Sequence, residues 1–125
     1  MNRPIKFRAW DGSKMIYSDE SDIADFFWAV REEKIKDVMQ FTGLLDRHGK
    51  EIYEGDIIRF TEIDEDSCFG REDTEVVEVR WLEDICQFRA IFRSGRRTEL
   101  HFVVQLPTVK ECEVIGNIYE NKDLL

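Results

Sequence analysis

The first part of the chain alternates apolar and polar residues with the period of a half-buried strand. Ile5, Phe7 and Ala9 occupy alternate positions, which places their side chains on one face. The dipeptide Asp11-Gly12 follows them, and it favours a type I′ turn because both central positions of that turn need a positive φ. The pattern predicts a β-hairpin over residues 5–17.

The next segment changes to the period of a helix. Four apolar side chains recur at spacings that place them on one helical face: Ile23, Phe26, Phe27 and Val30. Ser21 is a suitable N-cap, and we predict a helix from about Asp22 to Glu33. Trp28 falls beside this stripe, and the pattern leaves open whether its ring covers the edge of a core or forms an exposed contact.

From residue 38 onward the period of two returns and predicts strands. These strands lie at residues 38–41, 51–60 with a break at 54–56, 76–81, 88–92, 98–106 and 113–119. The stretch Thr98–Leu106 is the longest clean alternation, and Pro107 ends it because proline cannot donate to a ladder. Several short strands at close spacing predict a small closed or nearly closed barrel. We therefore predict a mainly β protein with one minor helix, divided into a hairpin and helix over residues 1–40 and a barrel over residues 41–125.

Composition narrows the class of protein. The chain has 125 residues and a net charge of −9, which argues against a general binder of nucleic acid, since such proteins neutralise phosphates. It contains no apolar run of the roughly twenty residues that a membrane span needs, and no signal peptide is visible at Met1. Cys68, Cys86 and Cys112 are odd in number and form no C-x-x-C pair, so we expect reduced thiols in a soluble, intracellular protein.

Acidic residues concentrate between Thr61 and Glu75, where seven acids accompany one base. Four of them fall at ligand positions 1, 3, 9 and 12 of a calcium-binding EF-hand loop, namely Asp64, Asp66, Glu72 and Glu75. Position 6, which needs glycine, is Phe69, so the pattern predicts a solvated acidic loop without calcium. The cysteines and histidines match no zinc spacing, and the chain carries no motif of an enzyme or of a cofactor site.

Basic residues concentrate around the predicted turn at Ser94-Gly95. Four arginines surround this turn and interleave with Phe88 and Phe92: Arg89, Arg93, Arg96 and Arg97. Basic and aromatic side chains in alternation are typical of a surface for nucleic acid or for an acidic partner. The alternative is a soluble hairpin with a basic outer face, which the acidity of the whole chain favours.

Four segments, in this order along the chain, together resemble the YopX family: Ile5–Asp11, Met39–Leu44, Gly49–Ile58 and Glu113–Asn121. Lys122 departs from the proline that this family pattern suggests. The resemblance implies a small protein of phages and prophages, located in the cytoplasm of the bacterial host cell, with an SH3-type β-barrel and no catalytic residue. The residues of the resemblance that we single out as structural are Gly43, Gly49, Tyr53, Gly55, Asp56, Gly116, Asn117 and Tyr119. We expect the glycines at turns or close backbone approaches, and Tyr53 and Tyr119 as plugs of a small barrel.

Three functions remain open at this level. The first is a non-enzymatic protein-binding module that engages a host or phage protein. The second is a nucleic-acid-associated barrel that uses the hairpin Arg93–Arg97, and the third is an acidic mimic of DNA that uses Thr61–Glu75. We also expect a homo-oligomer, because a strand such as Ile5–Trp10 could pair with a second copy. Trp10, Trp28 and Trp81 are candidates for an apolar contact between copies.

Overall fold

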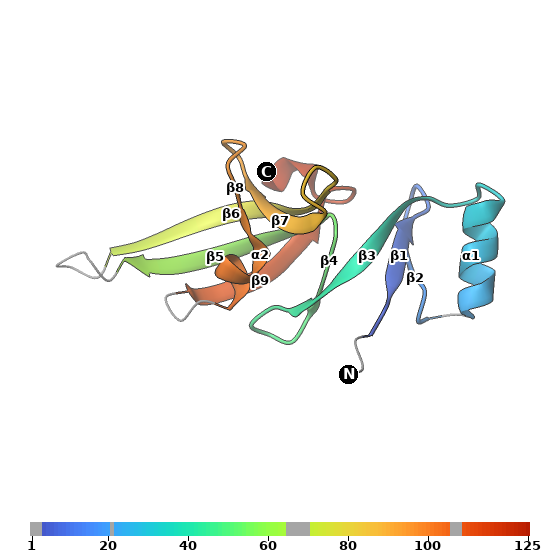
Figure 1. Ribbon diagram of the computed structural model, residues 1–125, viewed down its shortest axis with the longest axis horizontal. Helices are drawn as coiled ribbons and strands as arrows, with labels where there is room; N and C mark the ends of the chain where they lie inside the picture. The colour runs from blue at the N-terminus through green and yellow to red at the C-terminus, as the bar shows by residue number, and fades with distance from the viewer. Residues whose placement is uncertain (1–3, 21, 65–70, 106–108) are drawn as a thin grey trace.

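The computed structural model describes residues 4–20, 22–64, 71–105 and 109–125. Strands dominate these residues, and they form two sheets that follow one another along an elongated molecule (Figure 1). Helix α1 (Ile23–Arg31) lies at one end, beside the first sheet. Within the described ranges, no helix reaches the length and apolar character of a membrane-spanning segment. The prediction of a mainly β fold with a minor helix is confirmed.

The first sheet has four strands in the order β2-β1-β3-β4. Their bounds are Phe7–Trp10 for β1, Met15–Tyr17 for β2, Lys36–Leu45 for β3 and Glu51–Tyr53 for β4. Strands β1 and β2 form the predicted hairpin, with Ala9 opposite Ile16. Strand β3 pairs with both β1 and β4 and runs without a break through residues 40 and 41.

The turn of this hairpin differs from the prediction. Four residues, Asp11–Lys14, connect the two strands, and within them only Gly12 has a positive φ, of 104°. One carboxylate oxygen of Asp11 accepts hydrogen bonds from the backbone N–H groups of Ser13 and Lys14, each at 2.8 Å. Because this side chain organises a longer loop, a two-residue turn with positive φ at both positions does not form.

Helix α1 is shorter than its predicted span. Asp22 is the N-cap, since its carboxylate accepts the backbone N–H of Ala24 at 2.9 Å. Ser21, the predicted cap, lies outside the described residues. The helix ends at Arg31, and Glu33 adopts a left-handed φ of 57°. A left-handed residue terminates a helix, which explains why the helix does not reach its predicted end at Glu33.

Helix α1 also buries less of its apolar face than the periodicity predicted. Phe26 is buried with Ala9 and Ile35 in a small core beside β1. Ile23 and Phe27, which the same periodicity assigned to the core, are exposed. The hairpin beneath the helix has strands of only four and three residues, so it covers one row of helical side chains and leaves the neighbouring row in solvent.

The second sheet has five antiparallel strands in the order β8-β7-β6-β5-β9 and curls into a half-barrel (Figure 1). Their bounds are Asp56–Asp64 for β5, Arg71–Leu82 for β6, Gln87–Phe92 for β7, Arg97–Glu99 for β8 and Val109–Asn117 for β9. A turn at Glu54 and Gly55 separates β4 from β5 and places these consecutive strands in different sheets.

The segment from residue 98 to residue 106 is not the long strand that its alternation predicted. Strand β8 ends at Glu99, and helix α2 (Leu100–Val104) follows. Three side chains of α2 are buried at the helical spacing i, i+3 and i+4: Leu100, Val103 and Val104. Phe102, which strand alternation would place inside, is exposed. A run of five apolar-rich residues satisfies both periods, and packing across the open side of the half-barrel selects the helix.

The main core lies inside the half-barrel, and α2 contacts β3, β7, β8 and β9 around it. Its buried side chains are Ile52, Ile58, Phe60, Val77, Val79, Ala90, Phe92, Leu100, Val103, Val104, Val109, Cys112 and Val114. A second, smaller cluster lies under α1.

The polar turn between β3 and β4 covers the outer edge of β9. Asp46 Oδ2 accepts the backbone N–H of Val114 at 3.0 Å. The backbone N–H of Arg47 donates to the carbonyl of Cys112 at 2.9 Å, and Arg47 Nη2 donates to the carbonyl of Val109 at 2.7 Å. An uncovered strand edge is a template for pairing with another chain, so this turn protects β9 and ties the two sheets together.

Candidate functional site

A buried ion pair joins the N-terminal hairpin to the second sheet. Arg8 lies on β1 and Asp56 begins β5, and their side chains are only 4% and 3% exposed. Arg8 Nη2 donates to Asp56 Oδ1 at 2.8 Å and to the backbone carbonyl of Glu54 at 3.2 Å. The other carboxylate oxygen of Asp56 accepts the backbone N–H of Tyr53 at 2.8 Å. The pair therefore connects β1, β4 and β5 at one point, which we call the Arg8–Asp56 junction.

Aromatic rings enclose this junction. The Arg8 guanidinium lies 4.8 Å from the centre of the Tyr53 ring, which also meets the rings of Tyr17 and Phe41 at 5.6 Å each. Burial raises the pKa of Asp56, and the positive charge of Arg8 opposes that rise. Arg8 Nε is buried and has no hydrogen-bond partner among the described residues. Removal of the Arg8 and Asp56 charges from water therefore costs much free energy on folding, and the surrounding packing holds the two charges together.

Two hollows, of about 340 Å³ and 270 Å³, flank the junction. Arg8, Tyr17 and Lys50 line both of them. Acidic side chains accompany the positively charged Arg8 and Lys50, with Glu51 in the first hollow and Glu120 in the second. Because charges of both signs line each hollow, neither hollow selects an anion or a cation.

Most of the residues that the sequence singled out lie around the junction. Tyr53 and Asp56 belong to it directly. Gly55 adopts a φ of 88°, and its N–H donates to the carbonyl of Val79 at 2.8 Å, so a turn and a close backbone approach coincide there. Gly49, at a φ of 80°, lies in the turn between β3 and β4 and lines the first hollow.

The residues at the end of β9 approach the same junction. The side-chain oxygen of Asn117 accepts the backbone N–H groups of Tyr119 and Glu120, both at 3.0 Å, and so shapes the turn after β9. The Tyr119 ring stacks on Trp10 of the hairpin with centroids 5.7 Å apart. Tyr119 and Tyr53 were expected to plug the barrel, but neither belongs to its core, because both rings pack against the N-terminal hairpin.

Gly43 lies apart from the junction, within β3. It is exposed and adopts a φ of 90° in the stretch where the register of β3 against β4 shifts, between Phe41 and Leu45. An irregular strand position with positive φ favours glycine. This residue therefore shapes the strand rather than the junction.

Gly116 on β9 is packed too closely to carry a side chain. A Cβ atom there would lie 2.6 Å from Asn121 Cγ and 2.9 Å from Asn121 Cβ. We expect Gly116→Ala to displace Asn121 and lower the free energy of unfolding by about 1–3 kcal/mol, measured by urea denaturation. Addition of Asn121→Gly should remove most of this loss because it removes the clashing atoms.

Gly49→Ala is the matched control for that prediction. The space around Gly49 is open within 4 Å, so its variant carries only the strain of a φ of 80°, which is about 1 kcal/mol. Asn121→Gly should not improve the stability of the Gly49→Ala variant. Equal effects of Asn121→Gly in the two backgrounds would show that Gly116 is not held by this contact.

A larger hollow, of about 520 Å³, opens between the end of β3, the β6–β7 turn and the start of α2. We call it the Trp81 groove. The residues that define it here are Leu44, Trp81, Cys86, Phe88, Glu99 and His101. The Trp81 and Phe88 rings meet edge to face at 5.0 Å, and Trp81 remains 38% exposed. Ile85, which precedes Cys86 in the β6–β7 turn, is exposed as well.

The rim of the Trp81 groove is polar. His101 Nε2 lies 3.3 Å from Glu99 Oε2, and the thiol of Cys86 donates to the carbonyl of Glu83 at 3.5 Å. Cys86 adopts a positive φ of 50°, a backbone conformation that is unfavourable for residues other than glycine and recurs at binding sites.

Sequence analysis placed His101 in a strand, whereas it lies in the first turn of α2. Sequence analysis named Trp81 only as a contact between copies and missed the groove.

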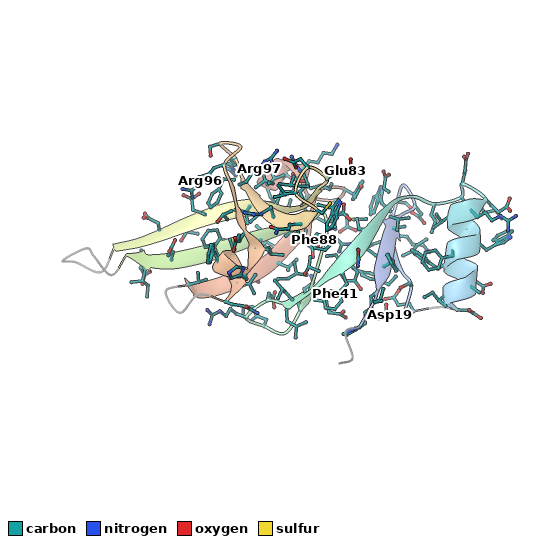
Figure 2. The ribbon with its side chains drawn as sticks, viewed as in Figure 1. Asp19, Phe41, Glu83, Phe88, Arg96 and Arg97 are labelled. Carbon is teal, nitrogen blue, oxygen red and sulfur yellow. The ribbon has the colours of Figure 1, made fainter. Side chains whose placement is uncertain are left out.

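The arginines of the predicted basic hairpin make contacts within the molecule. Figure 2 shows Arg96 and Arg97 beside the turn between β7 and β8. The contacts are Arg93 with the carbonyl of Leu124 at 2.8 Å, Arg97 with Asp84 at 2.9 Å, Arg96 with the Phe92 ring at 4.1 Å and Arg89 with Gln87 at 2.8 Å. These guanidinium groups are therefore already engaged.

The acidic segment is strand rather than loop wherever the structure describes it. Residues 61–64 belong to β5 and residues 71–75 to β6, because the two sides pair in register. Glu62 lies directly opposite Asp73 in this ladder, an arrangement of like charges that destabilises a sheet. Asp66 and Phe69, two positions of the calcium pattern, lie outside the described residues.

The described residues contain no group of three or more His, Cys, Asp or Glu side chains placed to hold a metal ion. Cys112 is buried in the main core, and burial raises the pKa of its thiol to about 11. Cys86 is exposed at the Trp81 groove, and Cys68 lies outside the described residues.

Hairpin, helix and half-barrel together define a small, mainly β protein in which a buried ion pair joins the hairpin to the half-barrel. The profile described as YopX protein matches residues 6–125. The chain belongs to the YopX family. The crystal structure of protein EF1440 from Enterococcus faecalis is similar, with 23% sequence identity, 99% of each chain covered and a TM-score of 0.57, and this likeness supports the fold alone. No curated protein sequence matches the chain.

Proposed function

We propose that this YopX-family protein is a non-enzymatic protein-binding module that engages a protein of a phage or of its bacterial host through the Trp81 groove. The observation that carries the proposal is the partly exposed aromatic pair in this groove, Trp81 and Phe88, whose rings are in contact. Aromatic side chains at a concave surface are typical anchors of protein interfaces.

The rim of the groove indicates what kind of segment it takes. Glu99 places a carboxylate at the rim of the groove, and the backbone carbonyl of Glu83 accepts the Cys86 thiol there. An apolar side chain of the partner would rest on Trp81, and a neighbouring Lys or Arg would face the acidic rim. The occupant is therefore an extended partner segment that combines an apolar anchor with a basic residue.

Two observations favour protein binding over the alternatives. The arginines of the β7–β8 hairpin are engaged within the molecule, which leaves less positive charge for phosphates. In the groove, the Cys86 thiol donates to a backbone carbonyl and the His101 imidazole faces Glu99. A nucleophilic pair would require the imidazole to take the thiol proton.

The first test is an affinity pulldown from bacterial lysate with three baits: the wild type, Trp81→Ala and Trp28→Ala. We expect a defined protein to be retained by the wild type and reduced at least about tenfold by Trp81→Ala, since loss of a buried aromatic anchor weakens binding by about 2 kcal/mol or more. Quantitative mass spectrometry of the eluates measures the retention.

Trp28→Ala is the matched control because Trp28 is another exposed tryptophan, on α1 and away from the groove. It should retain the partner at the wild-type level. Circular dichroism of each bait confirms folding. Retention of the same protein by wild type and Trp81→Ala in equal amounts would exclude the groove as the binding surface.

A second candidate function rests on the opposed carboxylates of Glu62 and Asp73 on the β5–β6 arm. Such an arm could mimic the negative charge of DNA and occupy a DNA-binding protein. The discriminating variant changes Glu62, Glu72 and Asp73 to the corresponding amides in the same pulldown. Loss of the partner from this variant, together with its retention by Trp81→Ala, would favour the mimic over the groove.

A further inference from the structure

The larger of the two hollows beside the Arg8–Asp56 junction, which we call the Tyr53 hollow, is built on the first sheet. Arg8 of β1, Tyr17 of β2 and Tyr53 of β4 line it. Its volume of about 340 Å³ lies at the small end of the range of roughly 300–1,000 Å³ for small-molecule sites. Strand β1 lies between β2 and β3 and has no free edge, so the structure does not support the pairing of Ile5–Trp10 with a second copy that the sequence predicted. The strand contributes a wall of this hollow instead.

The Tyr53 hydroxyl is a polar group without a partner on a buried side chain. Tyr53 is only 3% exposed, and its hydroxyl makes no hydrogen bond with any described residue. Burial raises the pKa of Tyr53, so the hydroxyl keeps its proton at neutral pH and can donate it. A buried donor without a partner costs free energy, and a ligand atom that accepts this hydrogen bond would recover it.

Several charges around the Tyr53 hollow already have partners in the protein. Arg8 is paired with Asp56. Lys6 Nζ lies 3.0 Å from Glu51 Oε2 and 3.8 Å from Asp19 Oδ2. These contacts leave Arg8 and Glu51 with little free charge for a ligand, whereas Asp19, at the longer distance, keeps part of its own.

One lining charge of each sign has no ion-pair partner among the described residues. Lys50 is the cation and Glu20 is the anion. Lys50 precedes β4, which carries Tyr53, whereas Glu20 follows Asp19 in the segment after β2. Lys50 and the Tyr53 hydroxyl are donors for a carboxylate, and the carboxylates of Glu20 and Asp19 are acceptors for an ammonium group.

We propose that the Tyr53 hollow binds a free amino acid, whose carboxylate accepts from the Tyr53 hydroxyl and Lys50 and whose ammonium group faces Glu20. A ligand with a single charge would satisfy one side of the hollow and leave the other without its counter-charge. The rings of Tyr17 and Tyr53 meet edge to face at 5.6 Å and offer an apolar surface to the ligand's side chain. The hollow shares no residue with the Trp81 groove, so this inference does not depend on the proposed function.

The first test is scanning calorimetry of the full chain, alone and with each of the standard L-amino acids. At a ligand concentration of about 2 mM, at least one amino acid should raise the midpoint of unfolding by at least about 3 °C, because a ligand that binds only the folded state stabilises it. Two derivatives of that amino acid then test the need for both charges. Its amide lacks the carboxylate and its N-acetyl derivative lacks the ammonium group, and neither should raise the midpoint.

Two variants locate the bound amino acid. Tyr53→Phe removes only the hydroxyl, so without ligand it should unfold at the wild-type midpoint or above. It should nevertheless bind the amino acid at least about tenfold more weakly in titration calorimetry, the effect of one hydrogen bond to a charged group. Lys50→Gln should weaken binding to a similar extent. Lys34→Gln is the matched control, because Lys34 lies over the Trp28 ring outside the hollow, and it should bind as the wild type does.

A midpoint that no amino acid raises would overturn the proposal. An amide or N-acetyl derivative that binds as tightly as the free amino acid would also overturn it, because the hollow would then not require both charges. If Tyr53→Phe lost its fold, Lys50→Gln would carry the test. Wild-type affinity in the folded variants of Tyr53 and Lys50, or an equal loss in Lys34→Gln, would show that the amino acid binds elsewhere.

Discussion

Replacement of Arg8 by methionine should lower the free energy of unfolding by about 3–5 kcal/mol, the range for a buried pair that loses one partner. The Asp56 carboxylate would remain buried, with only the Tyr53 N–H as donor among its present partners. Asp56→Asn should be destabilising as well, because it leaves the Arg8 guanidinium without its counter-charge. Urea denaturation followed by circular dichroism measures both losses.

The double variant Arg8→Met/Asp56→Asn separates this explanation from a general loss of packing. It should be more stable than the sum of the two single losses predicts, because neither uncompensated charge remains. Arg59→Met is the matched control, since Arg59 pairs with Glu113 at 3.1 Å but both side chains are about half exposed, at 50% and 45%. It should lose less than about 1 kcal/mol. Strict additivity at Arg8 and Asp56 would contradict the coupling.

Asp46→Ala should lower the free energy of unfolding by about 3 kcal/mol, the upper range for hydrogen bonds to a charged group. The Asp46 carboxylate accepts three backbone N–H groups, those of Val114 at 3.0 Å and of His48 and Lys50 at 2.8 Å. Its loss leaves these donors unsatisfied and detaches the β3–β4 turn from the edge of β9. Asp46→Asn should lose less, because an amide oxygen still accepts within the turn.

The same carboxylate makes stability depend on pH. Burial tends to raise the pKa of Asp46, but the N–H groups of Val114, Lys50 and His48 prevail and hold this pKa below its ordinary value of 3.8. A lowered pKa in the folded state means that the stabilisation is complete above the ordinary value and is lost as pH falls through the folded-state value. Urea midpoints from pH 6 to about pH 2 should show a steeper fall for the wild type than for Asp46→Asn. Parallel curves would contradict this role.

The hydrophobic periodicity of the sequence was sufficient to predict secondary structure where a segment's neighbours along the chain determine its conformation. The alternation of Phe7 and Ala9 predicted the hairpin, and the helical spacing around Phe26 predicted α1. It failed at residues 100–104, whose five residues fit a strand and a helix equally until the core of the half-barrel selected Leu100, Val103 and Val104 as the buried face.

The two sites were beyond sequence pattern for a different reason. Arg8 and Asp56 are 48 residues apart, and only the fold of β1 against the start of β5 brings them together. The family resemblance identified Asp56 but offered no partner for it. The Trp81 groove likewise combines β3, the β6–β7 turn and α2. The one local signal in the sequence is a tryptophan next to a polar turn, and this signal does not show which residues the fold places on the other side of the groove.

Photo-crosslinking from Cys86 tests the proposed binding groove most directly. Cys86 is exposed at the rim, while Cys112 is buried with a pKa of about 11, so a maleimide-linked benzophenone should label Cys86 selectively in a Cys68→Ser variant. The control carries the same label on Ser13→Cys, in the exposed turn of the hairpin, with Cys86→Ser added.

Irradiation in bacterial lysate should yield one crosslinked partner from Cys86. The crosslink should disappear with Trp81→Ala and be absent from the control at residue 13. Its crosslinked peptide should contain an apolar residue beside a Lys or Arg. The same proteins crosslinked from both positions, or a partner unaffected by Trp81→Ala, would contradict the account.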